Sequence, residues 1–364
     1  MIKSAYIHIP FCDTICSYCD FCKVYYHKEL IFPYLGALEA EIKNNYKGES
    51  LSTIYVGGGT PSSLSLEELR KLLEILTILK REEHCEYTIE CNIENITEEK
   101  IKLFSSFGVN RISIGVQTFQ EKYLSFLNRR HTKEEVFEKV DMVKKYITNL
   151  NIDLIYAIPG ETLEELDNDL DYFLSLEVPH ISTYSLIIEE NTVLNNKGIK
   201  PIDEELDFKM YGLIEKKLNH YHHYEISNFA LTGYESKHNL TYWKNEEYYG
   251  FGSGSSGYVD DVRYTNTKSI KHYLEEYKRI EEKRISLKEK IENEFILGFR
   301  ILDGISITNF EKKYGKNPIH FKAVKDFIDK NMLEVRGNFL RIPKDYIYIS
   351  NEILVSFIDC QEDF

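Results

Sequence analysis

Short apolar runs alternate with amphipathic stretches over roughly the first half of the chain. Six runs are rich in β-branched or aromatic residues, which is typical of buried parallel strands: residues 5–9, 53–56, 87–91, 111–115, 151–156 and 180–186. Helical patterns lie between them at residues 33–46, 66–81, 98–107, 133–146 and 163–176. Six β-α units in series predict an α/β fold with a parallel sheet and right-handed crossovers. The alternation stops near Leu186, which favours an open, partial (β/α)6 TIM-like barrel over a closed eight-fold one.

The pattern changes from about residue 203. A helix is expected at 204–218, an irregular segment rich in Gly, Ser, Tyr and Asn at 225–264, and a charged helical stretch at 270–299. Two helices and a hairpin, with strands at 332–335 and 339–342, then predict a small α+β, winged-helix-like module. We therefore expect three domains: the barrel at 1–202, an extension at 203–285 and the winged-helix-like domain at 286–364.

The charge and composition of the chain indicate which partners and which cellular compartment to expect. The net charge of −14 argues against a large phosphate-binding surface, so no nucleic acid is expected, and the C-terminal module is assigned a packing or lid role. No apolar run is long enough to span a bilayer, although peripheral membrane association stays open. The odd number of cysteines, seven, and the absence of an apolar leader predict a reducing, cytoplasmic location.

Three cysteines, Cys12, Cys16 and Cys19, follow the first predicted strand with the spacing C-x3-C-x2-C, and Tyr18 precedes the last of them. Three thiolates on so short a loop can hold three irons of a [4Fe–4S] cube and leave the fourth iron open. A zinc site that adds Cys22, or disulfides, are the alternatives, and the compartment and spacing favour the cluster. The spacing resembles that of radical S-adenosylmethionine (SAM) proteins. In that superfamily the open iron chelates SAM, and reduction yields a 5′-deoxyadenosyl radical.

Polar residues stand at the ends of the next predicted strands. The segment Gly57 to Pro61 follows the second strand, Glu90 the third, Gln117 the fourth with Arg129 further on, and Asp153 lies in the fifth. Consecutive glycines admit a ligand close to the backbone, and a buried Glu needs a partner. Each residue alone is more typical of a structural hydrogen bond. Together, at successive strand ends, they favour a cofactor site.

Four segments resemble the coproporphyrinogen III oxidase-like branch of radical SAM proteins: YIHIPFC at 6–12, GGGTP at 57–61, RISIGVQTF at 111–119 and NIDLIY at 151–156. The resemblance covers nearly the whole chain. It implies contacts with SAM, of which the branch carries two molecules, through Tyr6, Gly58, Gly59, Thr60, Glu90, Gln117, Arg129 and Asp153. Tyr18, in the cysteine loop, is expected to contact the cofactors as well.

Within this branch the oxidase type has a fourth cysteine two residues after the third, whereas the heme-chaperone type has Asp-Phe. This chain reads Asp20-Phe21 and carries the chaperone-type motif HNxxYW at 238–243. The resemblance implies that His238 is a candidate heme ligand, although a histidine beside a Tyr-Trp pair is more often a core residue. A family histidine is missing from the loop at 252–257, where Ser255 and Ser256 stand.

The resemblance thus implies a heme chaperone that uses a [4Fe–4S] cluster and SAM and passes heme to an acceptor protein. SAM cleavage is expected, and a homodimer is consistent with the family. The alternative is an oxygen-independent coproporphyrinogen III oxidase, in which the radical abstracts hydrogen from propionates and loss of CO2 leaves vinyl groups. An RNA-modifying enzyme of this superfamily would carry a basic domain, and the charge of −14 counts against one.

Overall fold

The computed structural model describes residues 1–275 and 279–358, and the chain divides into two compact units. Unit 1 comprises Met1–Asn219 and Glu247–Lys283, and unit 2 comprises His220–Glu246 and Arg284–Phe364. Each unit is therefore built from two stretches of chain. The sequence analysis expected three domains, each of one continuous stretch of chain. This finer division of the chain stays a prediction.

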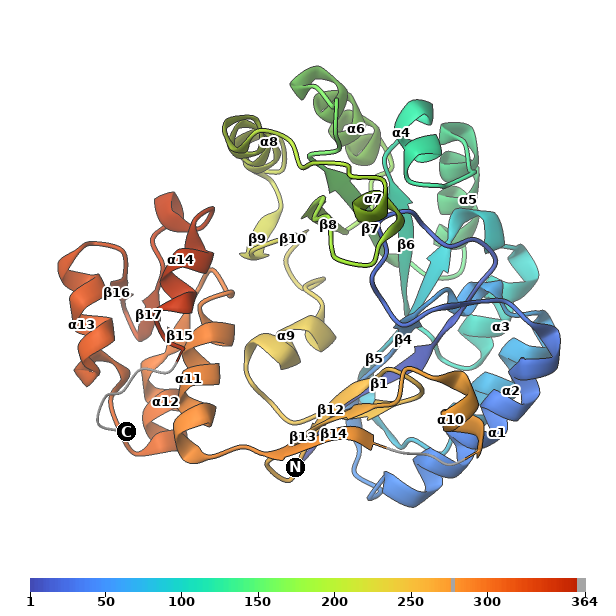
Figure 1. Cartoon of the computed structure of the whole chain (residues 1–364), viewed down its shortest axis with the longest axis horizontal. Coiled ribbons are helices and arrows are strands. Elements are labelled where there is room, and N and C mark those ends of the chain that lie inside the picture. The colour runs from blue at the N-terminus through green and yellow to red at the C-terminus, as the bar shows by residue number, and fades with distance from the viewer. Residues whose placement is uncertain (276–278, 359–364) are drawn as a thin grey trace. The chain divides into compact units, whose positions relative to one another are not determined.

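Six parallel strands form the centre of unit 1 (Figure 1). They are hydrogen-bonded in chain order: β1 (Ser4–Ile9), β4 (Leu51–Gly58), β5 (Arg81–Asn92), β6 (Arg111–Gln117), β7 (Asn149–Tyr156) and β8 (His180–Ser185). Each strand is parallel to the next. This order confirms the predicted partial barrel. A further strand, β11 (Tyr249–Phe251), pairs in parallel with the other edge of β1 and lies within the segment expected to be irregular.

Helices follow the strands and cover their outer side (Figure 1): α1 (Lys28–Asn45), α2 (Leu66–Leu76), α3 (Glu98–Ser106), α5 (Lys133–Lys144) and α6 (Leu163–Ser175). Capping boxes at Ser65, Thr132 and Thr162 begin α2, α5 and α6, because each side chain accepts from a backbone N–H of the first turn. Helix α2 ends at Leu76, earlier than expected. Residues from Arg81 onward instead extend β5, where Arg81 pairs with Leu51.

Smaller elements complete unit 1. They are β2 (Phe11–Cys12), β3 (Val24–Tyr25), α4 (Glu121–Phe126), α7 (Val193–Asn196), α8 (Glu204–Lys217), α10 (Ile270–Glu275) and the 3-10 helices Pro61–Ser63 and Ile93–Asn95. A three-stranded sheet contains β12 (Ser256–Val259), β13 (Val262–Asn266) and β14 (Arg279–Arg284), whose last residue already belongs to unit 2. The helix expected at 270–299 is wrong in its middle part, where β14 forms instead. The sequence of β14, RIEEKR, has no apolar face that a helix could bury. Residues 276–278 of the expected helix lie outside the described part.

Unit 2 contains β9 (His222–Glu225), β10 (Asn228–Ala230), α9 (Lys237–Trp243), α11 (Leu287–Gly298), α12 (Ile307–Tyr314), α13 (Lys322–Asp329), α14 (Ser350–Val355) and the 3-10 helices Pro318–His320 and Lys344–Tyr346. A small sheet has the order β15 (Ile305–Ser306), β17 (Phe339–Arg341), β16 (Glu334–Arg336). The antiparallel pair β16–β17 is the predicted hairpin. Phe295 is at the centre of the core, with its ring 5.1 Å from that of Phe310 and 5.0 Å from that of Phe357.

Candidate metal and cofactor site

A cavity of about 410 Å³ in unit 1 is lined by residues from the carboxyl ends of the parallel strands and from the cysteine loop. In barrels of this kind the loops at these strand ends carry the chemistry. The lining includes eleven residues singled out from the sequence: Cys12, Cys16, Tyr18, Cys19, Gly58, Gly59, Thr60, Glu90, Gln117, Arg129 and Asp153. The fold therefore brings together most of the predicted site.

The cysteine loop is held in place by the end of helix α4. The backbone N–H of Ser17 donates to the carbonyl of Leu127 at 3.1 Å, and the Ser17 hydroxyl donates to the carbonyl of Phe126 at 2.8 Å. The amide of Asn128 donates to the carbonyl of Ile15 at 2.7 Å. Tyr18 packs against the buried apolar cluster that contains Leu127. The framework of unit 1 thus positions the loop through its own contacts.

The thiols fit an iron–sulfur cluster. Burial raises the pKa of Cys12 to about 11, although the Thr60 hydroxyl, 3.4 Å from its sulfur, opposes the shift. Burial also raises the pKa of Cys19. Buried thiolates at this position require positive charge nearby, which the irons of a cluster supply.

A mononuclear zinc site fits less well. Cys22 is not among the cavity residues, and its sulfur instead lies 3.5 Å from the carbonyl of Lys268. In residues 1–275 and 279–358, no three His, Cys, Asp or Glu side chains lie close enough to hold one metal ion. Zinc bonds of about 2.3 Å to sulfur demand such closeness, whereas the ligands of a four-iron cube are spread over separate irons.

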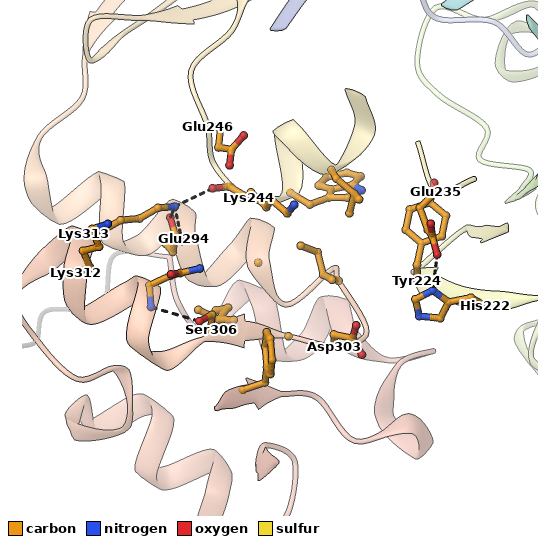
Figure 2. A pocket seen from close by; sticks show the side chains of 18 residues that line it. His222, Tyr224, Glu235, Lys244, Glu246, Glu294, Asp303, Ser306, Lys312 and Lys313 are labelled. Atoms are coloured by element: carbon orange, nitrogen blue, oxygen red, sulfur yellow. Dashed lines mark hydrogen bonds and ion pairs between the residues drawn. The ribbon is translucent and has the colours of Figure 1, made fainter. Parts of the chain in front are cut away.

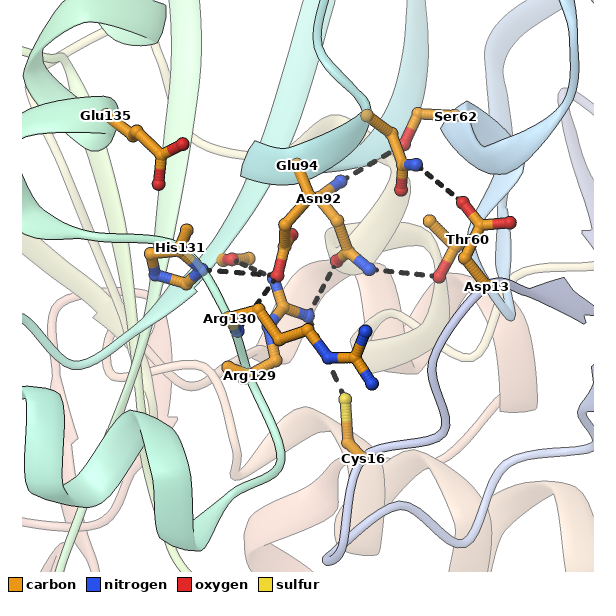
Figure 3. A network of polar contacts seen from close by, with 12 residues as sticks. Asp13, Cys16, Thr60, Ser62, Asn92, Glu94, Arg129, Arg130, His131 and Glu135 are labelled. Carbon is orange, nitrogen blue, oxygen red and sulfur yellow. Dashed lines mark hydrogen bonds and ion pairs between the residues drawn. The ribbon is translucent and has the colours of Figure 1, made fainter.

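A buried guanidinium lies beside the cysteine loop (Figure 3). Arg129 donates to the Asn92 side-chain oxygen and to the Gly115 carbonyl, each at 2.8 Å, and lies 3.3 Å from a Glu94 carboxylate oxygen. Its Nη1 is 3.8 Å from the sulfur of Cys16. These contacts engage both terminal nitrogens, so Arg129 brings a fixed positive charge to the cavity, and that charge would attract the carboxylate of a bound amino acid.

Glu94 holds Arg129 from the other side. Burial alone would raise the pKa of Glu94, but the hydrogen bond from His131 and the charge of Arg129 bring it down to about 2. Nδ1 of His131 lies 3.5 Å from Oε1 of Glu94, and Figure 3 shows Arg129 and His131 on either side of this carboxylate. Glu94 is therefore ionised at neutral pH and orients the guanidinium.

Two carboxyl groups are enclosed on the strand side of the cavity. Glu90 accepts from the Tyr55 hydroxyl at 2.8 Å and from the Gly58 N–H at 3.0 Å, and burial raises its pKa to about 7. Asp153 accepts from the Ser113 hydroxyl at 3.1 Å, and burial raises its pKa as well. Such groups suit a ligand that brings positive charge or hydroxyls to them.

The backbone around the cavity depends on small residues and one strained residue. A Cβ at Gly57 would lie 2.7 Å from the Glu90 carboxyl, so a larger residue there would displace that carboxyl from its hydrogen bonds with Tyr55 and Gly58. Gln117 has a φ of +72°, in the left-handed region that non-glycine residues rarely adopt. Strain of this kind is concentrated at functional sites, and here it falls where β6 ends at the cavity.

Two predicted residues lie elsewhere. Tyr6 is not among the residues that line the cavity. Its hydroxyl is 3.0 Å from Nδ1 of His8, whose Nε2 is 2.7 Å from the Cys22 carbonyl. His238 belongs to unit 2, is 1% exposed, and has its Nε2 2.8 Å from the Tyr242 hydroxyl.

Sequence reasoning missed the polar partners Tyr55, Asn92, Ser113 and Glu94. Asn92 could have been found, because it stands two residues after Glu90 and a strand places such residues on the same face. Tyr55 and Ser113 had no such signal, since hydroxyl residues within a strand are common.

Comparisons with known proteins agree with this site. The radical SAM superfamily model matches residues 6–173, and the HemN C-terminal domain model matches residues 285–345. The heme chaperone HemW of Lactococcus lactis subsp. lactis (strain IL1403) is 45% identical over 98% of this chain and 97% of that protein. The chain belongs to the HemW family. HemW of Bacillus subtilis (strain 168) is 38% identical over 98% of this chain and 99% of its own length.

A solved structure shows the same fold. Coproporphyrinogen III oxidase (HemN) from Escherichia coli, described as a radical SAM enzyme, superposes with a TM-score of 0.86 at 19% identity, over 98% of this chain and 90% of that one. As a radical SAM family, HemW proteins imply a [4Fe–4S] cluster and SAM, so the expectation of these two cofactors is confirmed at the level of the family. Within the described parts of this HemW family member, no helix has the length and apolar character needed to cross a bilayer.

Proposed function

We propose that this protein is a heme chaperone, which binds heme and transfers it to an acceptor protein in the cytoplasm. The observation that carries the proposal is the 45% identity, over nearly the full length of both chains, with a protein named heme chaperone HemW. The acceptor protein and a homodimer are parts of this proposal, as are the absence of a nucleic-acid partner and a peripheral contact with membranes. The resemblance implies His238, in the HNxxYW motif, as one candidate ligand of the heme.

The cavity of unit 1 supports a retained radical SAM function. Cys12, Cys16 and Cys19 would hold the cluster, which supplies the electron that breaks the C–S bond of SAM. Arg129 is placed to bind the SAM carboxylate, and Glu90 to accept from its hydroxyl or amino groups. The other proposed contacts with SAM are Tyr6, Tyr18, Gly58, Gly59, Thr60, Gln117 and Asp153.

The alternative is an oxygen-independent coproporphyrinogen III oxidase. The TM-score of 0.86 with HemN favours a shared fold, but 19% identity does not extend to activity. The position of a fourth cysteine in the oxidase type is occupied here by Phe21, which lines the cavity and is 65% exposed. The chaperone is therefore the favoured function.

The test uses the anaerobically reconstituted, full-length protein with reductant, SAM and coproporphyrinogen III. We expect 5′-deoxyadenosine without decarboxylated porphyrinogen, and saturable binding of heme in a separate titration. Formation of the decarboxylated product would establish the oxidase instead. Absence of heme binding would refute the chaperone proposal whatever the result with SAM.

A further inference from the structure

Unit 2 contains a cavity of about 680 Å³ that the site in unit 1 does not use (Figure 2). Its lining comes from β9, α9, α11, α12 and the small sheet, all within unit 2. The apolar side chains Trp243, Leu240, Ile301, Ile305 and Phe339 form part of the wall, and Phe339 is 40% exposed. The volume lies in the range of about 300–1,000 Å³ that is typical of cavities for cofactors and drug-sized ligands.

A histidine–carboxylate pair stands at one side of this cavity (Figure 2). Nδ1 of His222 lies 2.9 Å from Oε1 of Glu235, whose second oxygen accepts from the Gly233 N–H at 2.9 Å. A carboxylate on one ring nitrogen is the usual device that fixes the tautomer of a metal-binding histidine and directs the other nitrogen at the metal.

The two histidines of this region differ in accessibility. The His222 side chain is 43% exposed, and Nδ1 is engaged by Glu235, which leaves Nε2 to face a ligand. In contrast, His238 is 1% exposed with Nε2 next to Tyr242. The residues of α9 that line the cavity include Trp243 and Lys244, and at about 100° per residue they lie on the opposite side of the helix from His238.

Lysine side chains also line the cavity, with Lys312 and Lys313 on the side away from His222 and Lys244 between the two sides (Figure 2). Lys244 and Lys312 line it without an ion-pair partner among the described residues, whereas Lys313 is held by Glu294 at 2.8 Å. The carboxylates of Asp303 and Glu246 also line the cavity. The lining therefore offers an apolar wall, a directed imidazole and unpaired cations at separate places.

We infer that this cavity is a heme site in which Nε2 of His222 is an axial ligand of the iron and Lys244 and Lys312 face the propionates. The inference rests on the proposed heme chaperone function and names its binding site. An imidazole is a common protein ligand of heme iron, the wall buries the porphyrin body, and ammonium groups stabilise carboxylates that remain near solvent. In this arrangement His238 has a structural role, because its Nε2 contacts the hydroxyl of Tyr242 in the same helix, α9.

The test is a titration of the full-length protein with ferric heme, followed in the Soret band, for the parent and for His222→Ala. We expect Kd to rise at least about tenfold with a shift of the Soret maximum, and added imidazole to restore the band position. His220→Ala is the matched control, because His220 is an exposed histidine just before β9 that does not line the cavity. Circular dichroism spectra and melting curves verify that each variant is folded.

Titration with iron-free protoporphyrin IX distinguishes loss of the axial bond to iron from a general loss of the binding site. His222→Ala should leave its affinity unchanged, because no axial bond forms, whereas Lys244→Glu should weaken both ligands. Equal losses for heme and protoporphyrin in His222→Ala would overturn the axial role. Unchanged heme binding in His222→Ala together with its loss in His238→Ala would also overturn the inference and assign the ligand to the motif, with the chaperone proposal intact. No heme binding by the parent would refute both.

Discussion

Glu90 leads to a testable prediction about stability, because its carboxyl is partly buried at the cavity and its pKa is raised to about 7. Burial is the main cause, and the nearby carboxylate of Asp153 adds to it, while hydrogen bonds from Tyr55 and Gly58 oppose it. The substitution Glu90→Gln keeps an acceptor oxygen and nearly the same shape but removes the charge. The variant should therefore be more stable than the parent in the absence of SAM, and it should bind SAM less well.

The size of the gain follows from the shift between the unfolded and folded pKa values. For an acid whose pKa is raised on folding, the cost is absent below the unfolded value, grows between about 4.5 and 7, and is complete above 7. At about 1.4 kcal/mol per pKa unit, the gain is up to about 3 kcal/mol at pH 8 and about 1 kcal/mol at pH 5. Water in the cavity reduces these upper values. For a unit of this size, 3 kcal/mol raises Tm by about 6–10 °C.

The assay is thermal unfolding of the anaerobic, cluster-loaded protein at pH 5 and pH 8, with and without SAM. Glu99→Gln, on the exposed first turn of α3, is the control and should change Tm little at either pH. The stabilising effect of SAM on the parent should be smaller in Glu90→Gln. A variant that melts at or below the parent at pH 8, or gains equally at both pH values, would refute the reasoning.

Three further predictions concern the same cavity. Cys16→Ser should lose both the brown iron–sulfur absorbance and 5′-deoxyadenosine formation. Cys22→Ser is the control and should retain both, because the Cys22 sulfur lies next to the Lys268 carbonyl and not in the cavity. Unchanged iron content in Cys16→Ser would contradict the cluster assignment. Gly57→Ala should lower the unfolding free energy by about 1–3 kcal/mol, measured by urea denaturation, because its Cβ would lie 2.7 Å from a carboxyl group. Gly36→Ala, in helix α1 with nothing within 4 Å, should gain about 0.5–1 kcal/mol, and a loss there equal to that of Gly57→Ala would count against the steric argument. Arg129→Lys keeps the charge but cannot make the contacts to Asn92 and Gly115 that fix its position, so the Kd for SAM, measured by calorimetry, should rise at least about tenfold, and an unchanged Kd would show that the positive charge alone is enough.

The central sheet could be predicted because each strand is a short apolar run, and the helices after β4, β5 and β7 begin at a side-chain cap. The six expected runs lie within β1, β4, β5, β6, β7 and β8 apart from a one-residue overrun at Leu186, and the structure mainly extends them. Strand β11 could not be found this way, because three residues in a stretch rich in Gly, Ser and Tyr carry no periodicity. It becomes a strand of the sheet only through its pairing with β1, which is far away in the sequence.

Some residues of the candidate site could be predicted from the sequence and others could not. Glu90 and Asp153, which lie in strands β5 and β7, could be selected because a lone acid in an apolar run is unusual. Glu94, which orients Arg129, lies in the 3-10 helix Ile93–Asn95, and nothing in its local sequence distinguishes it from a surface acid. The cavity of unit 2 depends on chain segments far apart in sequence, so no local pattern predicts it.

The pairing of β1 with β11 has a consequence for synthesis on the ribosome. Ala5 and Tyr249 are partners in the sheet, so one edge of the first strand stays uncovered until the last part of unit 1 has emerged. At about 5–20 residues per second, that interval is on the order of tens of seconds. An uncovered apolar strand is a template for aggregation. During most of translation, a nascent chain of this protein therefore has one uncovered edge on β1, the strand that directly precedes the cysteine loop.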